Sequence, residues 1–361
     1  VSYYNHIGGF TVTEPTIHNL VIIGGGPAGL SAAISAGSEL PNVVLLDSGK
    51  KTSPKTYEAI IGGQIRETAR IENHPGVLSA SGRQLIETFV KQAEGMGVDI
   101  HCPVHASSIE MLESDLKCVT TREGQKFITR AVILANGLSY RRMPESTDVD
   151  TFLGSGVKYG AMDIKPGDLG PCNIGIVGAA NSAGQAVLKL AENTDASITI
   201  FVRGKKTIHD QMSQYLIDRI QASPQIKVMQ DVEVVKATGD SHLEQVQLKH
   251  GDGTISRQTC DHMFVFIGAM PKAQWLRDTI VTNERGFILT GDQLGQIPSF
   301  QQLPHETSMS GVFAAGDIQQ SMTKRVTAAT GDGSSAVSAL HRYLALIASG
   351  ERKSTRLQRR A

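Results

Sequence analysis

The sequence predicts an α/β protein with two three-layer domains, each a parallel sheet covered by helices, the first domain being discontinuous. The order of buried strand, glycine-rich turn and helix occurs at 20–37 and again at 174–192. A last apolar strand at 312–314 and the long helix after it do not continue the second unit, so we expect them to return to the first. The predicted domains are therefore 1–141 with 269–361, and 142–268 between them.

The composition is that of a globular chain without a strong electrostatic preference. Its 361 residues are enough for two cores of ordinary size, and 35 basic residues balance 35 acidic ones. We therefore expect no nucleic-acid or membrane partner. No apolar run approaches the roughly 18 residues that span a bilayer, and the first residues lack the pattern of a signal peptide. Four widely spaced cysteines favour a reducing compartment, so the predicted location is cytoplasmic.

The first unit begins with an apolar run that is typical of a buried parallel strand. Pro27 then opens a helix, because proline is favoured in the first helical turn, and Asp47 ends the next strand. Ser81 is expected to cap an amphipathic helix. In order, we expect a strand at 20–23, a helix at 27–37, a strand at 43–46, a surface loop at 48–60, a helix from the cap at 81 to about 96, short alternating strands to 129 and a strand at 131–135.

The second unit repeats this pattern and is followed by the closing part of the first. We expect a strand at 174–177, a helix at 181–192, a strand at 197–202, a helix at 212–221, a β-meander ending at 264–267 and a helix from about 325 to 347. Residues 351–361, which include Arg352 and Arg360, are expected to form a solvated, disordered tail.

The first glycine-rich turn has the G-x-G-x-x-G pattern of a dinucleotide-binding loop, with its glycines at Gly24, Gly26 and Gly29. These glycines allow a tight turn, close approach of a pyrophosphate and close packing of the helix on the strand. Pro27 and Ala28 open that helix, whose N-terminus would face the phosphates with its partial positive charge. The pattern predicts a dinucleotide site at this turn.

Two acidic positions specify the ligand of this loop. Asp47, 18 residues past Gly29, stands where an acid accepts hydrogen bonds from a ribose. Gly316 and Asp317 end a distant strand, a position that commonly contacts the ribityl chain of FAD. We therefore predict FAD at the first site.

Together these segments resemble a low-molecular-weight thioredoxin reductase, a FAD- and NADPH-binding pyridine nucleotide–disulfide oxidoreductase, over about residues 19–346. Stretches at 62–64, 71–76 and 135–137 are similar to that family's flavin-contacting segments, and 324–326 opens a helix that the family places at the pyrimidine edge of the flavin. Stretches at 181–186, 212–216, 266–269 and 285–291 resemble a subgroup, often fused to cyclic-nucleotide-binding domains, that tends to lack the redox-active C-x-x-C. The resemblance implies a homodimer, and its cofactor-binding positions also include Gly63, Gln64, Asn73, Val104, Ala135, Asn136, Gly137, Lys324, Arg325 and Val326.

The stretch that corresponds to the family's C-x-x-C-D, at 158–163, contains no cysteine. Thiol–disulfide exchange needs an attacking thiolate and a resolving partner. Direct reduction of thioredoxin by the family's route is therefore disfavoured. We expect Tyr159 and Met162 to pack beneath the flavin ring, with a pocket for another acceptor as the alternative interpretation.

The second glycine-rich turn departs from the pattern. Its frame is Gly178, Ala180 and Ala183, so a methyl group stands where the backbone would approach a pyrophosphate, and Asn181 and Ser182 follow it. The added methyl would push the phosphates outward or select a different ligand pose.

Arg203 is the retained member of the arginine pair that binds the 2′-phosphate in NADPH-specific relatives, and Gly204 stands at the second position. NAD(P)H, a second dinucleotide such as another FAD, and an empty pocket all remain open for this site.

The predicted function is that of a FAD-dependent oxidoreductase without an internal redox disulfide. Its donor is a reduced nicotinamide, ferredoxin or a second flavin, and its acceptor is a small molecule or a protein. No acid–base residue is assigned, because the cofactor carries hydride transfer, and no cluster has metal-ligand spacing. Two rivals are a disulfide reductase that uses Cys102 with Cys118 or Cys172 with Cys260, and a non-catalytic flavin redox sensor.

Overall fold

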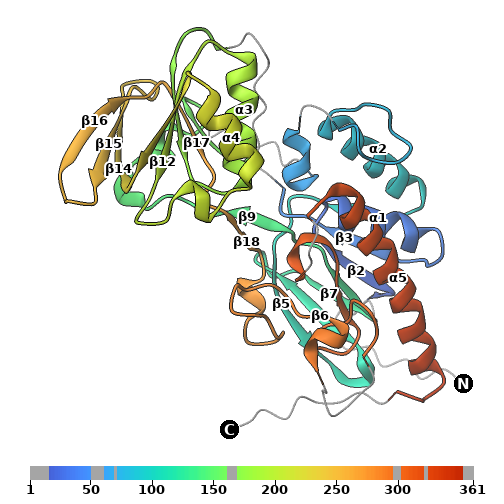
Figure 1. Cartoon of the computed structure of the whole chain (residues 1–361). Coiled ribbons are helices and arrows are strands. Elements are labelled where there is room, and N and C mark those ends of the chain that lie inside the picture. Colours follow the sequence, from blue (N-terminus) through green and yellow to red (C-terminus); the bar gives the residue numbers. More distant parts are fainter. Residues whose placement is uncertain are drawn as a thin grey trace, which may run out of the picture.

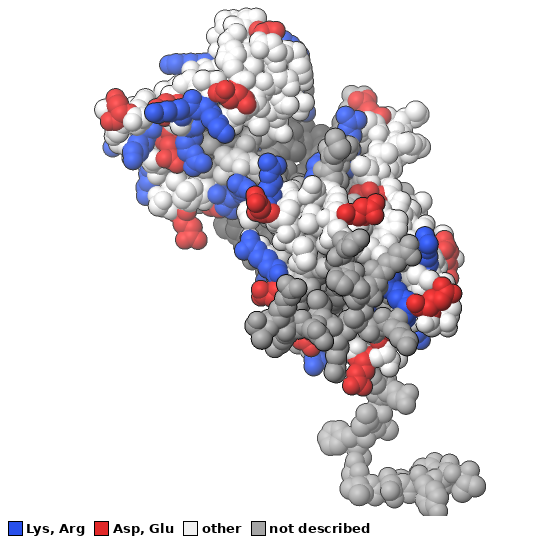
Figure 2. Space-filling view, turned by 60° about the horizontal axis from the view of Figure 1, so that its bottom comes forward, with Lys and Arg blue, Asp and Glu red and all other residues white. Residues whose placement is uncertain are grey.

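The computed structural model describes residues 16–49, 61–68, 71–160, 169–295, 302–320 and 324–352. Two lobes are visible: one is formed by the middle of the chain, and the other contains both ends of the described chain (Figure 1). Basic and acidic side chains are interspersed over both lobes on the face in Figure 2, in keeping with the balanced composition. Among the described residues, no helix combines the length and the apolar character that crossing a membrane requires.

The first lobe is built on a five-stranded parallel sheet. Its strand order is β19 (Val312–Ala314), β8 (Val132–Leu134), β2 (Leu20–Ile23), β3 (Val43–Leu46) and β4 (Asp99–His101). Phe313 pairs with Ile133, so the late strand joins the early sheet as the sequence predicts. This pairing places the turn at 315–317 beside the first glycine-rich loop.

Both faces of this sheet are covered, which explains its unbroken apolar strands. Leu20 and Ile22 pack with the helices α1 (Pro27–Gly37), α2 (Gly82–Gly95) and α5 (Val326–Ala348). Val21 and Ile23 pack on the other face, against a second sheet with the order β1 (Ile17–His18), β7 (Lys126–Thr129), β6 (Lys117–Thr121) and β5 (Ala106–Met111). The lobe therefore has three layers.

The second lobe repeats the arrangement. Its parallel sheet has the order β10 (Val157–Tyr159), β17 (His262–Val265), β11 (Asn173–Val177), β12 (Ser197–Val202) and β13 (Ile226–Gln230). One face packs with α3 (Asn181–Asn193) and α4 (Gln214–Ala222), and the other with the antiparallel strands β14 (Val232–Thr238), β15 (Gln245–His250) and β16 (Ile255–Thr259). The prediction of two three-layer α/β units is confirmed.

The lobes are joined by two antiparallel strands, β9 (Leu138–Tyr140) and β18 (Ala269–Pro271), in which Tyr140 pairs with Ala269 (Figure 1). Tyr140 also lies over Gly160: a Cβ on that glycine would be 2.0 Å from the Tyr140 ring. The chain thus enters and leaves the second lobe side by side.

Several local expectations need correction. The helix expected from 212 begins at Gln214, because Ser213 is extended and both its backbone N–H and its hydroxyl donate to Asn181 Oδ1. The two-residue strand β1 is too short to give a periodic pattern. Arg352, expected in a solvated tail, is 7% exposed and pairs with Glu306; residues 353–361 of that tail, and most of the loop at 48–60, lie outside the described residues.

The N-terminus of α2 offers a direct test of the local structure. Ser81 Oγ accepts from Gln84 N at 3.2 Å, and Gln84 Oε1 accepts from Ser81 N at 2.9 Å, a reciprocal capping box. We expect Ser81→Ala to lower the free energy of unfolding by about 1 kcal/mol in urea melts. Ser338→Ala, on the exposed side of α5, should change it by far less, and equal effects would contradict the capping assignment.

Candidate functional site

The three glycines of the first loop have different surroundings. Gly24 has φ +112°, and a Cβ there would lie 2.3 Å from Ala135 O; a Cβ on Gly29 would lie 1.7 Å from Gly24 O. Gly26 has φ −79° and ψ −175°, a conformation open to any residue, yet a Cβ on it would meet nothing within 4 Å. Packing within the chain therefore requires the first and third glycines, whereas the middle one faces open space.

Asp47 is fixed against this loop at the end of β3. Its Oδ2 accepts from Gly25 N at 2.6 Å, and its Oδ1 accepts from Gly49 N at 2.7 Å. Val104 N donates to Asp47 O at 2.8 Å, so the predicted residue Val104 lies next to it. The carboxylate thus has a defined orientation beside the helix N-terminus.

A short 3₁₀ helix, η1 (Gly63–Glu67), lies over the loop. A Cβ on Gly63 would be 3.6 Å from Gly26 Cα, and Gln64 Nε2 donates to Leu138 O at 3.0 Å in the connecting strand β9. After the end of β8, Asn136 Oδ1 is buried and has no hydrogen-bond partner among the described residues. Such a buried acceptor is costly unless a donor reaches it.

The turn after β19 completes this edge of the sheet. A Cβ on Gly316 would be 2.7 Å from Ala28 Cβ, and Gly316 N donates to Asp332 Oδ2 at 3.2 Å. Burial raises the pKa of Asp317; Lys324 opposes this effect and Asp332 adds to it. Lys324 Nζ donates to the backbone oxygen of Asp317 at 2.9 Å, which fixes the turn.

The N-terminus of α5 closes the other end of the site. Arg325 is the N-cap residue and Val326 the first helical residue. Thr327 Oγ1 donates to Asn73 O at 3.2 Å, which holds the segment around Asn73 against this helix end. His74 Nδ1 is buried without a partner among the described residues. First-turn N–H groups here present partial positive charge to whatever lies between these segments.

The structure therefore brings the predicted first-site residues to one edge of the sheet. They come from the turn after β2, the end of β3, η1, the segment at 71–76, the end of β8 and the turn after β19. Gly137, with φ +64°, lies in the connection to β9. Asp332 was not predicted, because a single aspartate inside an apolar helix carries no sequence signal; only the fold places it against Gly316.

The second loop keeps the same backbone with a different middle residue. A Cβ on Gly178, at φ +126°, would be 2.4 Å from Phe266 O, and Ala183 is fully buried. Ala180 has φ −86° and ψ 172°, nearly the conformation of Gly26, and it is exposed. In the second loop, the methyl group of Ala180 therefore occupies the position that is open at Gly26 in the first loop.

Two predicted ligands of the second site already have partners within the lobe. Asn181 Oδ1 accepts from Ser213 N at 2.7 Å and from Ser213 Oγ at 3.0 Å, which ties α3 to α4. Arg203 Nη1 lies 3.4 Å from Glu233 Oε1, with both side chains exposed. Ser182 is exposed at the start of α3. The Arg203–Glu233 pair places a carboxylate beside the arginine that was expected to bind a 2′-phosphate.

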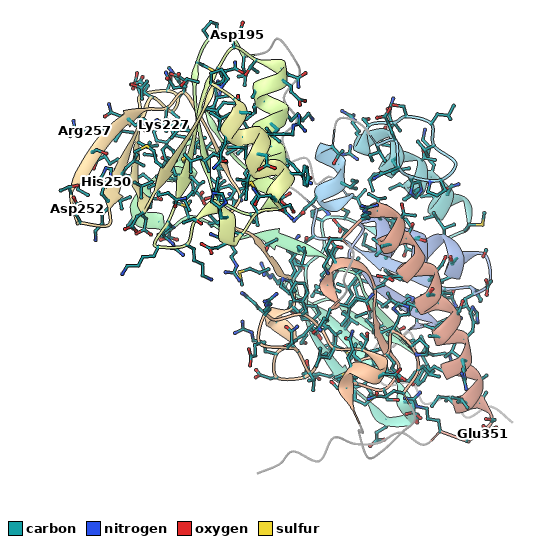
Figure 3. All side chains as sticks on the ribbon, in the orientation of Figure 1. Asp195, Lys227, His250, Asp252, Arg257 and Glu351 are labelled. Carbon is teal, nitrogen blue, oxygen red and sulfur yellow. The ribbon has the colours of Figure 1, made fainter. Side chains whose placement is uncertain are left out.

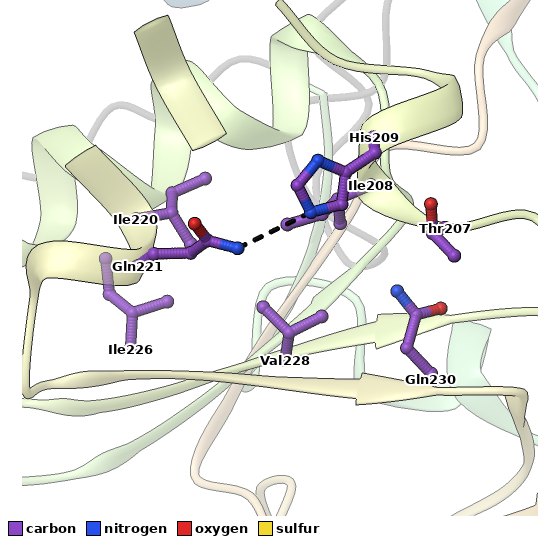
Figure 4. A pocket seen from close by; sticks show the side chains of 8 residues that line it. All are labelled: Thr207, Ile208, His209, Ile220, Gln221, Ile226, Val228 and Gln230. Carbon is purple, nitrogen blue, oxygen red and sulfur yellow. Dashed lines mark hydrogen bonds between the residues drawn. The ribbon is translucent and has the colours of Figure 1, made fainter. Parts of the chain in front are cut away.

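A pocket of about 470 Å³ lies next to this region, between η5 (Ile208–Asp210), α4 and the edge strand β13 (Figure 4). Its floor is aliphatic, and His209 Nε2 lies 3.4 Å from Gln221 Nε2 at one side. Gln230 lies at one end of it and pairs with Val202, the neighbour of Arg203. The pocket was not predicted, because it arises only from the packing of α4 beside β13.

All four cysteines are free thiols, so neither pair considered from the sequence forms a disulfide in the structure. Cys102 follows β4 and Cys118 lies on β6, in different sheets. Cys172 and Cys260 precede the neighbouring strands β11 and β17, but they pack into different hydrophobic clusters. Burial, with Asp47 nearby, raises the pKa of Cys102 to about 11, and burial raises that of Cys260 to about 12. These two thiols hold their protons at neutral pH and are weak nucleophiles.

Tyr159 is engaged within the second lobe. Its hydroxyl donates to Asp150 Oδ1 at 2.7 Å and accepts from Met143 N at 2.8 Å, and the Arg142 guanidinium lies 4.5 Å from the ring centroid. Burial raises its pKa to about 12. These contacts give Tyr159 a structural role, while Met162 lies outside the described residues.

Comparison with known proteins gives consistent matches. A family model described as pyridine nucleotide-disulphide oxidoreductase matches residues 18–333. A 34.2 kDa protein in the rubredoxin operon of Clostridium pasteurianum is 29% identical over 333 residues, which cover 90% of this chain and 97% of that protein. One subunit of the alkyl hydroperoxide reductase of Staphylococcus aureus is 26% identical; the match covers 91% of this chain but 59% of the relative.

Solved structures give the same result. The thioredoxin reductase of Lactococcus lactis in its FR conformation superposes with a TM-score of 0.70 at 27% identity, covering 91% of this chain and 99% of that one. The thioredoxin reductase of Streptococcus pyogenes gives a TM-score of 0.63 at 26% identity, covering 91% and 98%. The resemblance read from the sequence is therefore confirmed at the level of fold and family.

Proposed function

Because the chain belongs to the pyridine nucleotide-disulphide oxidoreductase family, we propose that it moves electrons from a reduced nicotinamide through FAD to an acceptor other than an internal disulfide. Its class is that of the FAD-dependent oxidoreductases resembling thioredoxin reductase, and this family uses FAD and NAD(P)H. The observation that carries the proposal is Gly26, which neither backbone conformation nor packing within the chain requires to be glycine.

We assign FAD to the first-site residues, from the pyrophosphate at the glycine-rich loop to the ring at the N-terminus of α5. Gly26 leaves room for the pyrophosphate, and the α1 N-terminus offers its N–H groups to the phosphates. Asp47 would accept hydrogen bonds from the adenosine ribose, and Asp317 from the ribityl chain. The N-terminus of α5, at Arg325 and Val326, would face the pyrimidine edge and stabilise negative charge there. Bound FAD supplies the hydride and electron chemistry.

We assign the nicotinamide nucleotide to the second loop. The turn at Gly178 has the same geometry as the first loop, which supports a dinucleotide there. Ala180 and the Glu233 partner of Arg203 argue for weak binding of the phosphates. Ala180 and the Arg203–Glu233 pair also favour two alternatives: a second FAD in this site, or ferredoxin as the electron donor.

The choice of electron acceptor rests on the spacing and reactivity of the cysteines. No C-x-x-C occurs in the 361 residues, and the raised pKa values of Cys102 and Cys260 make these two thiols poor nucleophiles. We propose a small molecule or a small electron-carrier protein as acceptor; the relative in a rubredoxin operon supports the second. A cytoplasmic homodimer is proposed from the reducing use of cysteine and the resemblance to thioredoxin reductases.

An anaerobic titration tests this function. NADPH or NADH is added to the purified holoprotein while the flavin absorbance band is followed. Stoichiometric bleaching with either nucleotide, followed by turnover of a dye acceptor, supports the proposal. No bleaching with either would exclude a nicotinamide donor, and the FAD content per chain would then distinguish a second flavin from a ferredoxin donor.

Ala180→Gly tests the second loop. Removing the methyl opens the position that Gly26 leaves open in the first loop, so we expect the Kd of the preferred nicotinamide nucleotide to fall about tenfold, or about 1.4 kcal/mol. Isothermal titration measures it. Ala179→Gly, one residue earlier and buried, is the control and should give no such gain. Unchanged affinity in Ala180→Gly would show that the phosphates do not lie against this residue.

The two rivals have separate tests. A reductase that uses the unusual cysteines would lose turnover when Cys102 and Cys118, or Cys172 and Cys260, are changed to alanine; we expect turnover to persist. A flavin sensor would bleach slowly, fail to reduce a dye and change its affinity for a partner protein with its redox state.

A further inference from the structure

Four charged or ionisable side chains are buried together at the end of the first lobe opposite the glycine-rich loop. They come from four segments of the chain, and each residue is at most 7% exposed: Lys117, Glu306, Tyr343 and Arg352. Buried charges are costly unless they are paired and hydrogen-bonded. Figure 3 shows Glu351, the neighbour of Arg352, beyond the end of α5 and far from the second lobe.

Glu306 is the centre of this cluster. Its Oε1 accepts from Gly311 N at 2.9 Å and from Arg352 Nη2 at 2.7 Å, and its Oε2 accepts from Leu303 N at 3.1 Å. The carboxylate thus ties both ends of the turn before β19. Arg352 supplies its counter-charge, with its guanidinium 5.1 Å from the Tyr343 ring centroid.

Lys117 makes the hydrogen bonds on the other side of this cluster. Its Nζ donates to Asp115 O and Arg130 O at 2.9 Å each, and to Tyr343 Oη at 2.6 Å. Gly311 covers the cluster so closely that a Cβ there would be 2.3 Å from Lys117 Nζ. The Lys117 side chain therefore links β6 to the last third of α5.

Two rigid elements connect this cluster with the proposed flavin site. The segment at Glu306 forms a bridge with Phe313 in β19, and β19 leads directly into Gly316. The helix α5 carries Tyr343 at one end and Asp332 nearer the other, and Asp332 accepts from Gly316 N. Tyr343 follows Asp332 by eleven positions in the helix, which is a rise of about 16 Å along its axis.

We propose that Arg352 is a positioning residue for the flavin: by neutralising buried Glu306 it holds the turn before β19 and the end of α5, and through them Gly316 and Asp317. The inference rests on the proposed function only in that these two residues contact FAD. Removal of Arg352 leaves the buried carboxylate without the guanidinium that pairs with it, and the turn can relieve this cost by opening toward water.

The test compares Arg352→Met, Arg352→Lys and the double variant Glu306→Gln/Arg352→Met with the unchanged protein. Arg342→Met, an exposed arginine on the same helix, is the matched control. FAD affinity is measured by flavin fluorescence on reconstituting the apoprotein, and apoprotein stability by thermal melting. We expect about a tenfold higher Kd for FAD in Arg352→Met, partial recovery in Arg352→Lys and in the double variant, and no change in the control.

A pH series separates positioning from general stability. In Arg352→Met the buried carboxylate is faced by Lys117, Asp115 and Tyr343. Burial lowers the pKa of Lys117 to about 7, so lower pH lets this amine take up a proton and supply a positive charge beside Glu306. The FAD affinity of this variant should therefore recover between pH 8 and pH 6. The affinity of the unchanged protein should change less, because Arg352 pairs with Glu306 whether or not Lys117 is protonated. If Arg352→Met melts earlier but binds FAD with unchanged affinity, the proposal fails. If the unchanged protein binds no FAD, the proposed function fails instead; if Arg352→Met does not fold, Arg352→Lys and the double variant decide.

Discussion

Gly26→Val should abolish FAD binding and leave the fold intact. The residue has an extended conformation that valine adopts readily, and its Cβ position is free of protein atoms within 4 Å. The new side chain would fill the space assigned to the pyrophosphate and separate the phosphates from the N-terminus of α1. We expect at least about a 100-fold rise in the Kd for FAD, or about 2.8 kcal/mol, measured by reconstitution of the apoprotein.

The neighbouring glycines make this result specific. Gly29→Val, whose Cβ would collide with Gly24 O, should prevent correct folding rather than merely remove the cofactor. Gly95→Ala, a helical position with open surroundings, should alter neither property. A Gly26→Val protein that retains yellow colour after gel filtration would show that the pyrophosphate does not lie at this residue.

The free energy of unfolding of the unchanged protein should rise with pH because of buried Lys117, and Lys117→Met should remove this rise. Burial lowers the pKa of Lys117 from its ordinary value of 10.5 to about 7, opposed by Asp115 and Glu306 and assisted by Arg352. Between these two values the unfolded chain binds one proton more than the folded chain, so the free energy of unfolding rises with pH. The slope is at most about 1.4 kcal/mol per pH unit, and below about pH 7 the contribution levels off.

Urea melts of the apoprotein at pH 7.0, 7.8 and 8.5 measure this slope while the raised thiol pKa values keep Cys102 and Cys260 protonated. Methionine also loses the hydrogen bonds of the Lys117 nitrogen, so the variant is expected to be less stable at every pH. The slope is therefore the diagnostic quantity. Lys126→Met, exposed on the adjacent strand β7, should keep the slope, and parallel curves for the two variants would contradict the buried titration.

The sequence predicted the parts of the first site that depend on local geometry. Gly24, Gly26 and Gly29 lie one helical turn or less apart, so their spacing alone specifies the turn between β2 and α1. Asp47 followed from its fixed distance along one strand–helix–strand unit. The return of β19 was predictable because a buried strand needs a partner, and the second unit was already complete.

Other features depend on contacts between distant segments. Nothing in the local sequence distinguishes Lys117 from a surface lysine in an alternating strand, nor Arg352 from the rest of a basic tail. Asn181 was predicted as a nucleotide ligand from its position after the loop, yet Ser213, 32 residues later, occupies its acceptor. Pairings of this kind appear only when helices and strands are packed together.

The strands β9 and β18 make the second lobe an insertion with adjacent ends. Tyr140 and Ala269 are directly paired across two antiparallel strands, so their Cα atoms are about 5 Å apart. A hairpin turn of about two residues could therefore replace everything between them without changing the chain path in the first lobe. The molecule is in this sense modular: the first lobe can be engineered as a minimal scaffold, into which a different unit can be spliced at the same two positions.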